Sequence, residues 1–284
     1  MKKTIVLLLA AIFSISTVNA QYRKSNNWAS SRHSIYFGGG LNWFNGDIDP
    51  TDGTDGPSFK LLKKGSFSFD AGYKYKMTER FSLRLTALYS KITANDGDSK
   101  DASRKRRGVN FYSNSFEFAA NIDFYFIKEK EKRRYYFWDR WSSYIFAGAG
   151  LLTYNPKWNG SNIGDVKKGD KLRDLKTETV GYHKVTLSVP VGLGLKVLLT
   201  QKVSLGAELA LRYTTSDHID DLHGFYNLET QGAKDLNFAQ AAQGAKRGGN
   251  ETNDWYSTLL FNIGYKFGGP KFKSIRYYHI PKYY

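Results

Sequence analysis

Apolar and polar residues alternate strictly over several stretches of this chain, and no other feature limits its fold as strongly. Within residues 66–77, Phe67, Phe69, Ala71, Tyr73 and Tyr75 occupy every second position, and polar residues or glycine fill the positions between them. A period of two is typical of a β-strand with one apolar and one polar face. Residues 81–90 repeat the pattern after a short gap, which predicts a hairpin.

Eight stretches of this kind can be identified, and the connections between them alternate between short and long. The expected strands span residues 34–44, 66–77, 81–90, 115–126, 144–154, 182–199, 203–214 and 255–267. Short connections lie at 77–80 and 200–202, and long ones at 45–65, 93–109, 155–181 and 215–254. The connection at 128–140 is on the same side as the short ones, but it is longer and basic. Strands of ~10 residues with short turns on one side and long loops on the other are typical of outer-membrane barrels. We therefore predict an all-β fold, an eight-stranded antiparallel transmembrane β-barrel of OmpA-like size.

The N-terminus has the pattern of a cleaved secretory signal peptide. Lys2 and Lys3 precede nine consecutive apolar residues, and a small-residue cleavage site ends at Ala20. The apolar run is shorter than the ~20 residues that a membrane-spanning helix needs. We expect residues 1–20 to be removed, residues 21–267 to form the barrel, and residues 268–284 to follow it as a basic, aromatic tail.

The alternation alone does not distinguish a membrane barrel from a soluble lipocalin-like barrel or sandwich. The position of the aromatic residues favours the membrane barrel, because they lie at two levels along the strands, like the girdles at the two borders of a bilayer. The long-loop level holds Trp43, Tyr89, Phe116, Tyr213 and Trp255, and the short-turn level holds Tyr75, Phe81, Phe126, Tyr144, Tyr265 and Phe267. We expect short turns and tail in the periplasm and long loops outside the cell.

The polar faces predict a lumen filled with charged side chains. A barrel of eight strands is narrow, and unpaired charges in its interior are costly, so these side chains must pair with one another. General porin activity is therefore disfavoured. The residues expected inside are Asp70, Lys74, Arg84, Glu117, Asp123, Lys184, Lys196, Glu208 and Arg212.

Catalysis and metal binding have little support in the sequence. The chain has no cysteine, which excludes disulfides, thiol nucleophiles and thiolate metal sites. Its five histidines form no constellation with named catalytic roles, so we expect a non-enzymatic protein without a cofactor or metal. Acidic residues at 49–56, and Asp217, Asp220 and Asp221, lie near the same rim, where turn chemistry explains them better than a metal site.

Two basic segments point to partners. Residues 104–107, Arg-Lys-Arg-Arg, can bind lipopolysaccharide phosphates or form a solvated charge run, and outer-membrane lipid is the expected surrounding. Nucleic acid is a poor partner for a secreted barrel despite the isoelectric point of about 9.7. The tail has the composition of a periplasmic docking peptide or of a disordered end. Its candidate contacts are Lys271, Phe272, Lys273, Arg276, Tyr277 and Tyr278.

Two short motifs carry a resemblance to a known family. Residues 37–48, FGGGLNWFNGDI, and residues 213–222, YTTSDHIDDL, resemble the hallmarks of the PorG-like outer-membrane barrels of Bacteroidetes. His218 stands where an aromatic residue is usual in that family. The resemblance implies an integral barrel of the type IX secretion system, the machinery linked to gliding motility, associated with a periplasmic ring of a lipoprotein and its partner. It implies no catalytic residues.

In that interpretation Gly46 and Asp47 end the first strand, and Asp217, Asp220 and Asp221 follow the seventh. Both strands neighbour the eighth in a closed barrel, so we expect the motifs to meet at the rim and to order the loops. Secretion would depend on the periplasmic face. One alternative is an OmpA-type structural or adhesive barrel that is not involved in secretion, and another is a ligand channel.

Overall fold

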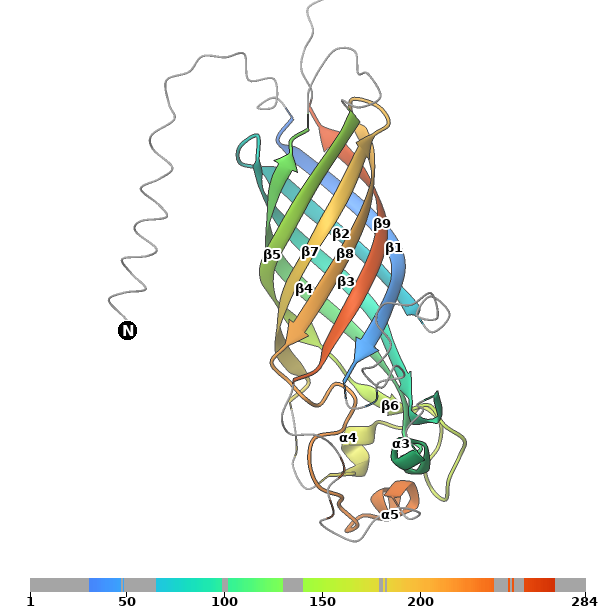
Figure 1. Ribbon diagram of the computed structural model, residues 1–284. Coiled ribbons are helices and arrows are strands. Elements are labelled where there is room, and N and C mark those ends of the chain that lie inside the picture. Colours follow the sequence, from blue (N-terminus) through green and yellow to red (C-terminus); the bar gives the residue numbers. More distant parts are fainter. Residues whose placement is uncertain are drawn as a thin grey trace, which may run out of the picture.

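Eight long antiparallel strands close into a barrel, as the alternation predicted (Figure 1). The computed structural model describes residues 31–46, 48, 65–98, 102–129, 140–178, 181, 183–237, 245, 247 and 253–268. The predicted signal peptide lies outside these residues. The strands are β1 (His33–Asn45), β2 (Ser66–Lys76), β3 (Phe81–Asn95), β4 (Asn110–Ile127), β5 (Trp141–Thr153), β7 (Val185–Leu198), β8 (Val203–Thr214) and β9 (Trp255–Phe267). Each pairs with its neighbours along the chain, and β1 pairs with β9 to complete the ring.

The β3–β4 hairpin is longer than predicted and extends beyond the other strands. The sequence predicted a loop over residues 93–109, but the two strands remain paired as far as Asn95 and Asn110. A further strand, β6 (Pro156–Trp158), pairs with the extended part of β4. The ladder therefore continues past the barrel and supports the long loops.

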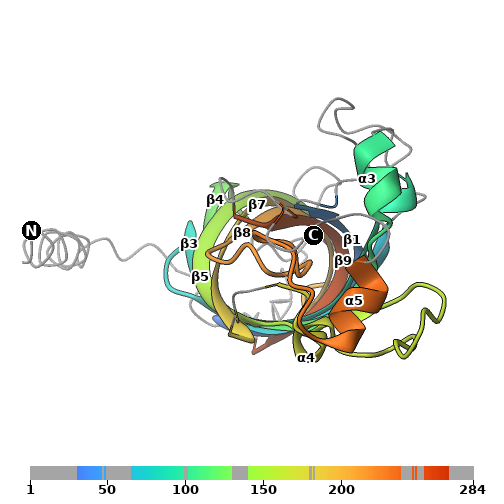
Figure 2. The same ribbon diagram turned by 90° about the horizontal axis from the view of Figure 1, so that it is seen from below.

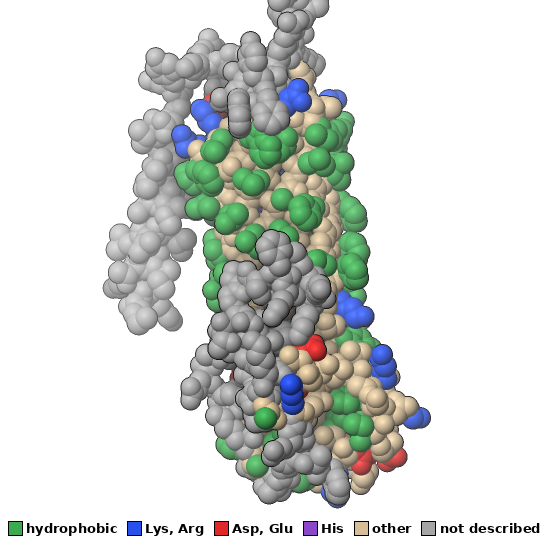
Figure 3. Space-filling view, turned by 45° about the vertical axis from the view of Figure 1, so that its right-hand side comes forward, with side chains coloured by type: hydrophobic (Ala, Val, Ile, Leu, Met, Phe, Trp, Pro, Cys, Tyr) green, Lys and Arg blue, Asp and Glu red, His purple; other side chains and the backbone are tan. Residues whose placement is uncertain are grey.

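Apolar side chains cover the outside of the barrel, and polar side chains fill the inside. Along β7, Leu187 is 54% exposed, whereas the next residue, Ser188, is 0% exposed. Phe118 on β4 is 63% exposed, and Asp123 on the inner face of the same strand is 0% exposed. A soluble barrel requires the reverse arrangement, because exposed apolar surface costs about 25 cal/mol per Å² in water. Figure 3 shows the resulting hydrophobic belt. We conclude that the barrel spans a lipid bilayer.

The aromatic girdles lie on the outer surface with one exception. Tyr89 packs against Phe116, with ring centroids 5.0 Å apart, at the long-loop level. Tyr144 was expected in the short-turn girdle, but it is 2% exposed and its hydroxyl donates a hydrogen bond to Glu208 in the lumen. The strand β5 begins earlier than predicted, and Trp141, three positions before Tyr144 and therefore on the opposite face, is 37% exposed and points outward instead. A Cβ atom on Gly194 would overlap the Tyr144 ring, which explains the glycine there.

Ion pairs fill the lumen. Arg84 joins Asp123 at 3.1 Å and Glu208 at 2.5 Å, and Lys74 reaches Asp123 at 2.8 Å. Arg212 pairs with Glu117 nearer the long loops. These contacts confirm the predicted pairing for Lys74, Arg84, Glu117, Asp123, Glu208 and Arg212. Asp70 is also buried in the lumen, but among the described residues it forms no ion pair, and its Oδ1 has no hydrogen-bond partner. The prediction was wrong for Lys184, which precedes β7 and is exposed.

The described parts of the long loops fold into a cap over one mouth of the barrel (Figures 1 and 2). Their short elements are η3 (Asp96–Asp98), α3 (Ala102–Arg107), α4 (Leu172–Leu175) and α5 (Gln231–Asn237). Ile48, Ile219 and Leu222 from the loops join one apolar cluster with Tyr256 and Leu260 from the inner wall of β9. This cluster closes the mouth with packed side chains. None of the helices described is long and apolar enough to cross a membrane.

Candidate functional site

The two motifs singled out in the sequence meet beneath the cap. The backbone N–H of Ile48 donates to Oδ2 of Asp220 at 3.2 Å, and the N–H of Leu222 donates to Oδ1 of the same carboxylate at 3.0 Å. Asp220 is 0% exposed. A buried carboxylate that accepts backbone N–H groups ties two loops together. Asp47 lies outside the described residues.

Asp254, at the other end of the same 215–254 connection, adds further contacts to this junction and was missed in the sequence. Its Oδ2 accepts the N–H of Ile219 at 2.9 Å, and its backbone C=O accepts the Thr214 hydroxyl at 2.7 Å. A Cβ atom on Gly46 would overlap Asp254 Oδ1 and the Phe44 ring, so glycine is required for the close approach. The position of Asp254, directly before the last strand, was the available signal.

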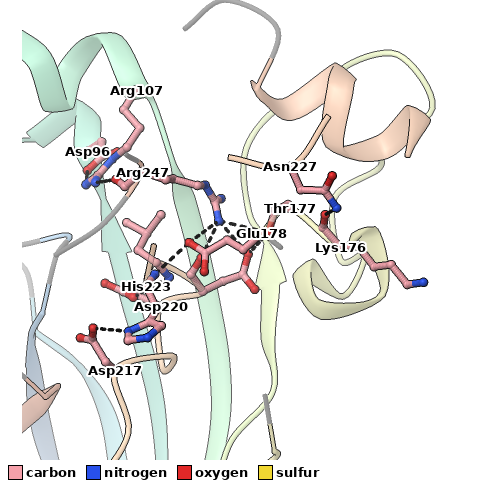
Figure 4. Close-up of polar contacts among 12 residues, drawn as sticks. Asp96, Arg107, Lys176, Thr177, Glu178, Asp217, Asp220, His223, Asn227 and Arg247 are labelled. Atoms are coloured by element: carbon pink, nitrogen blue, oxygen red, sulfur yellow. Dashed lines mark hydrogen bonds and ion pairs between the residues drawn. The ribbon is translucent and has the colours of Figure 1, made fainter. Parts of the chain in front are cut away.

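Asp221 belongs to a second network in the cap, which is centred on Arg247 (Figure 4). Arg247 Nη1 donates to the backbone C=O of Asp221 at 2.6 Å and pairs with the carboxylates of Glu178 at 3.2 Å and Asp221 at 3.3 Å. The Thr177 hydroxyl also donates to the Asp221 carboxylate. Asp221 has a φ of 65°, a left-handed conformation that Asp tolerates better than most residues. The network therefore holds the loop after β8 against the loop before β7.

Burial changes the acidity of this network. It raises the pKa of the Glu178 carboxyl group to about 7, although the nearby Arg247 guanidinium favours the ionised form. The network therefore holds two loops in position, and one of its carboxyl groups titrates near neutral pH.

A histidine pair lies beside the acidic motif. His223 Nδ1 is 2.8 Å from Asp217 Oδ2, and the ring centroids of His218 and His223 are 4.4 Å apart. Burial, and then the neighbouring His223 ring, lower the pKa of His218 to about 4. Among the described residues, no group of three or more acidic or histidine side chains is arranged to hold a metal ion.

The basic segment at residues 104–107 lies in α3, and the side chain of its last residue, Arg107, points into the cap. Arg107 donates from Nε and Nη2 to Asp96 at 2.7 and 2.8 Å, and from Nη1 to the Arg247 C=O at 3.0 Å. Arg107 therefore stabilises the cap and is not available for a phosphate group. The side chains at 103, 104 and 106 lie outside the part that the structure describes.

At the other mouth, a cluster of cations surrounds one carboxylate. Glu129, at the start of the connection 128–140, pairs with Lys196 at 2.8 Å and with Lys266. Arg32 and Lys76 line the same small cavity. The rest of that connection, and the tail with Lys271, Phe272, Lys273, Arg276, Tyr277 and Tyr278, lie outside the described residues.

A family model matches nearly the whole chain. Its description is "Domain of unknown function (DUF6089)", and it covers residues 5–273. The chain belongs to this family. The match extends over all eight barrel strands and the cap, so the architecture described above is that of a DUF6089 domain.

Several solved structures are similar to the chain at low identity. Neisserial surface protein A is 12% identical with a TM-score of 0.41, over 83% of this chain and 97% of that chain. Ail of Yersinia pestis, in complex with the heparin analogue sucrose octasulfate, is 12% identical with a TM-score of 0.40, over 84% and 99%. The outer membrane enzyme PagL is 12% identical with a TM-score of 0.31, over 81% and 97%. Similarity at this level carries no information on function. A comparison with curated protein sequences finds no match.

Proposed function

We propose that this chain is a non-enzymatic integral protein of the outer membrane that acts as an anchor and not as a channel. The observation that carries this proposal is the filled interior. Arg84 and its partners cross the lumen, the apolar cluster with Ile219 and Leu222 closes the long-loop mouth, and Glu129 lies among cations at the other mouth. A barrel built in this way acts through its two ends.

In this proposal the short turns and the tail face the periplasm, and the long loops face outward. Short periplasmic turns and longer outside loops are the usual arrangement in outer-membrane barrels. The cap then lies on the cell surface, and the cations around Glu129 face the periplasm.

We further propose that the periplasmic end associates with the ring of the type IX secretion machinery, formed by a lipoprotein and its partner. Support comes from the motifs at 37–48 and 213–222, which resemble those of PorG-like barrels and which meet through Ile48 and Asp220. The cations near Glu129 and those of the tail suit a partner surface that carries carboxylates.

Deletion of residues 269–284 tests this association. We expect the truncated barrel to fold, because the deletion leaves β9 complete, and to co-purify much less of the ring lipoprotein and its partner. Heat-modifiable migration in detergent gels reports folding. A matched control, Asp220→Ala in the cap, should leave ring association intact. Unchanged co-purification with the truncated chain would contradict the proposal.

A second candidate is an OmpA-type structural or adhesive barrel outside secretion. The folded cap favours it, because Phe225 is 47% exposed and Ile163 is 40% exposed among the loops beyond the barrel. This candidate predicts that a strain lacking the protein exports its cargo normally and that loop changes matter more than loss of the tail.

A further inference from the structure

Two lysines lie around one aromatic ring on the outer wall of the extended hairpin. Lys91 Nζ, from β3, is 5.5 Å from the centre of the Tyr112 ring, and Lys157 Nζ, from β6, is 5.9 Å from the same centre. Tyr112 lies on β4, paired with Thr93 on one side and Lys157 on the other. We call Lys91, Tyr112, Asn114 and Lys157 the lysine patch.

The lysine patch lies directly beyond the long-loop aromatic girdle. Lys91 follows Tyr89 by two residues on the outer face of β3, and Asn114 precedes Phe116 by two on β4. With a rise of about 3.3 Å per residue, Lys91 lies at most about 7 Å past the girdle. The headgroup layer of a bilayer is roughly 5–7 Å thick on each side. Lys91 and Asn114 therefore face the headgroups, and Tyr112 and Lys157 lie just above them.

Within the part of the chain that the structure describes, no carboxylate neutralises the positive charge of the lysine patch. Among the described residues, Lys91 and Lys157 form no ion pair with a carboxylate, in contrast to Arg107, which pairs with Asp96. Two like charges around one ring repel each other and attract an anion. The Tyr89 hydroxyl donates to Asn114 Oδ1 at 3.1 Å, which turns this amide oxygen toward Tyr89 and leaves the amide N–H groups for another acceptor.

Because the wall below the lysine patch is apolar, the ligand that suits both surfaces combines an anionic group with acyl chains. Phe116 and Phe118 are 50% and 63% exposed on β4 below Asn114. We infer that the lysine patch binds the phosphate of a phosphorylated glycolipid in the outer leaflet, whose acyl chains lie along this wall. The choice of leaflet rests on the orientation in the proposed function.

Binding to purified full-length protein in detergent tests the inference. The probes are bisphosphorylated lipid A, the same lipid without its phosphates, phosphatidylglycerol, and inorganic phosphate as a competitor. We expect the double variant Lys91→Gln/Lys157→Gln to bind bisphosphorylated lipid A roughly 30-fold more weakly, as expected for two membrane-facing lysines. Binding should also weaken as salt increases.

The matched control is Lys168→Gln/Lys184→Gln, which removes the same charge. Lys184 also lies at the long-loop end of its strand, since it precedes Val185, which pairs with Thr153. Both control lysines are exposed, and we expect affinity to stay within about threefold of the unmodified protein. Heat-modifiable gel migration confirms that every variant is folded.

Three results would overturn the inference. Equal binding by the two double variants would show that the lysine patch is not the site. Equal retention of the dephosphorylated lipid would assign binding to the apolar wall alone. Binding of phosphatidylglycerol as tight as that of lipid A, or displacement of lipid A by millimolar phosphate, would remove the glycolipid as the specific ligand. Ring co-purification is unaffected by these outcomes, so the two proposals fail separately.

Discussion

Arg84 joins two strands across the width of the lumen. Its guanidinium pairs with Asp123 on β4 and with Glu208 on β8, and its side chain is 2% exposed. The guanidinium carbon also lies 4.2 Å from the centre of the Phe146 ring. Breaking a buried ion pair by removing one partner costs about 3–5 kcal/mol, because the other charge stays buried.

We therefore predict that Arg84→Met lowers the free energy of unfolding by about 3–5 kcal/mol. Adding Glu208→Gln should recover part of this loss, since Asp123 keeps its contact with Lys74. Urea-induced unfolding in lipid vesicles measures both effects. Arg80→Met, on an exposed turn, serves as the control and should stay within about 0.5 kcal/mol. No loss with Arg84→Met would contradict the lumenal network.

His218 makes the cap sensitive to acid. Its pKa in the folded cap is about 4, below the ordinary value of 6.5, so the folded state binds this proton less readily than the unfolded state. Stability from neutral His218 is present above pH 6.5 and is lost as the pH falls toward 4. The contribution of Glu178 to stability depends on pH in the opposite direction. Its pKa is raised, so its stabilising effect is lost as the pH rises toward 7.

We predict that His218→Phe changes the pH profile of cap unfolding. Glu178 contributes to the unfolding temperature of both proteins, so its contribution cancels when the variant is compared with the unmodified protein. We expect the unfolding temperature of the variant, relative to that of the unmodified protein, to be higher at pH 4.5 than at pH 7. Thermal unfolding followed by tryptophan fluorescence measures it, with buried Trp158 as the reporter in the cap. The same difference at both pH values would show that His218 is not the acid-sensitive group.

At the scale of elements, the cap depends on a few carboxylates that hold loops to one another. Asp220 accepts two backbone N–H groups, those of Ile48 and Leu222. Leaving a buried donor without a partner costs about 1–3 kcal/mol. Loss of this side chain should therefore loosen the cap while the barrel, which is held by its own strand ladders, stays closed.

We predict that Asp220→Ala increases proteolysis of the cap strongly and that Asp220→Asn, which keeps one acceptor oxygen, does so less. The measurement is limited proteolysis of detergent-solubilised protein, with gel migration of the unboiled barrel as the fold reference. Asp174→Ala, at a side chain that is 64% exposed, is the matched control and should behave as the unmodified protein. A cap as resistant with Asp220→Ala as without it would refute this role.

The alternation predicted the barrel strands well, because a period-two pattern identifies the two faces of a strand without any long-range information. The prediction from this pattern failed at Tyr144. The strand β5 contains Gly148, Gly150 and several other small residues, so its sequence does not distinguish an apolar face from a polar one. The cap was beyond prediction in detail. Ile48 and Asp220 are 172 residues apart, and Arg247 reaches its partners from a loop without periodicity.

For the whole molecule, the central physical feature is the inversion of polarity between inside and outside. Apolar residues face outward between two aromatic girdles, and paired charges fill the lumen. This inversion supports both proposals, because a filled barrel acts through its ends and its outer wall contacts lipid. The chain has no cysteine, so single cysteines can be introduced as labelling sites without removing any native thiol.

The most direct test is a spin-label scan along β7 in liposomes, with single cysteines at Thr186, Leu187, Ser188, Val189 and Val191. Electron paramagnetic resonance measures the accessibility of each label to oxygen, which is enriched in lipid. We predict maxima at Leu187, Val189 and Val191 and minima at Thr186 and Ser188, following their exposed and buried positions. Maxima at Thr186 and Ser188, or no period of two, would contradict a barrel that faces lipid with its apolar side.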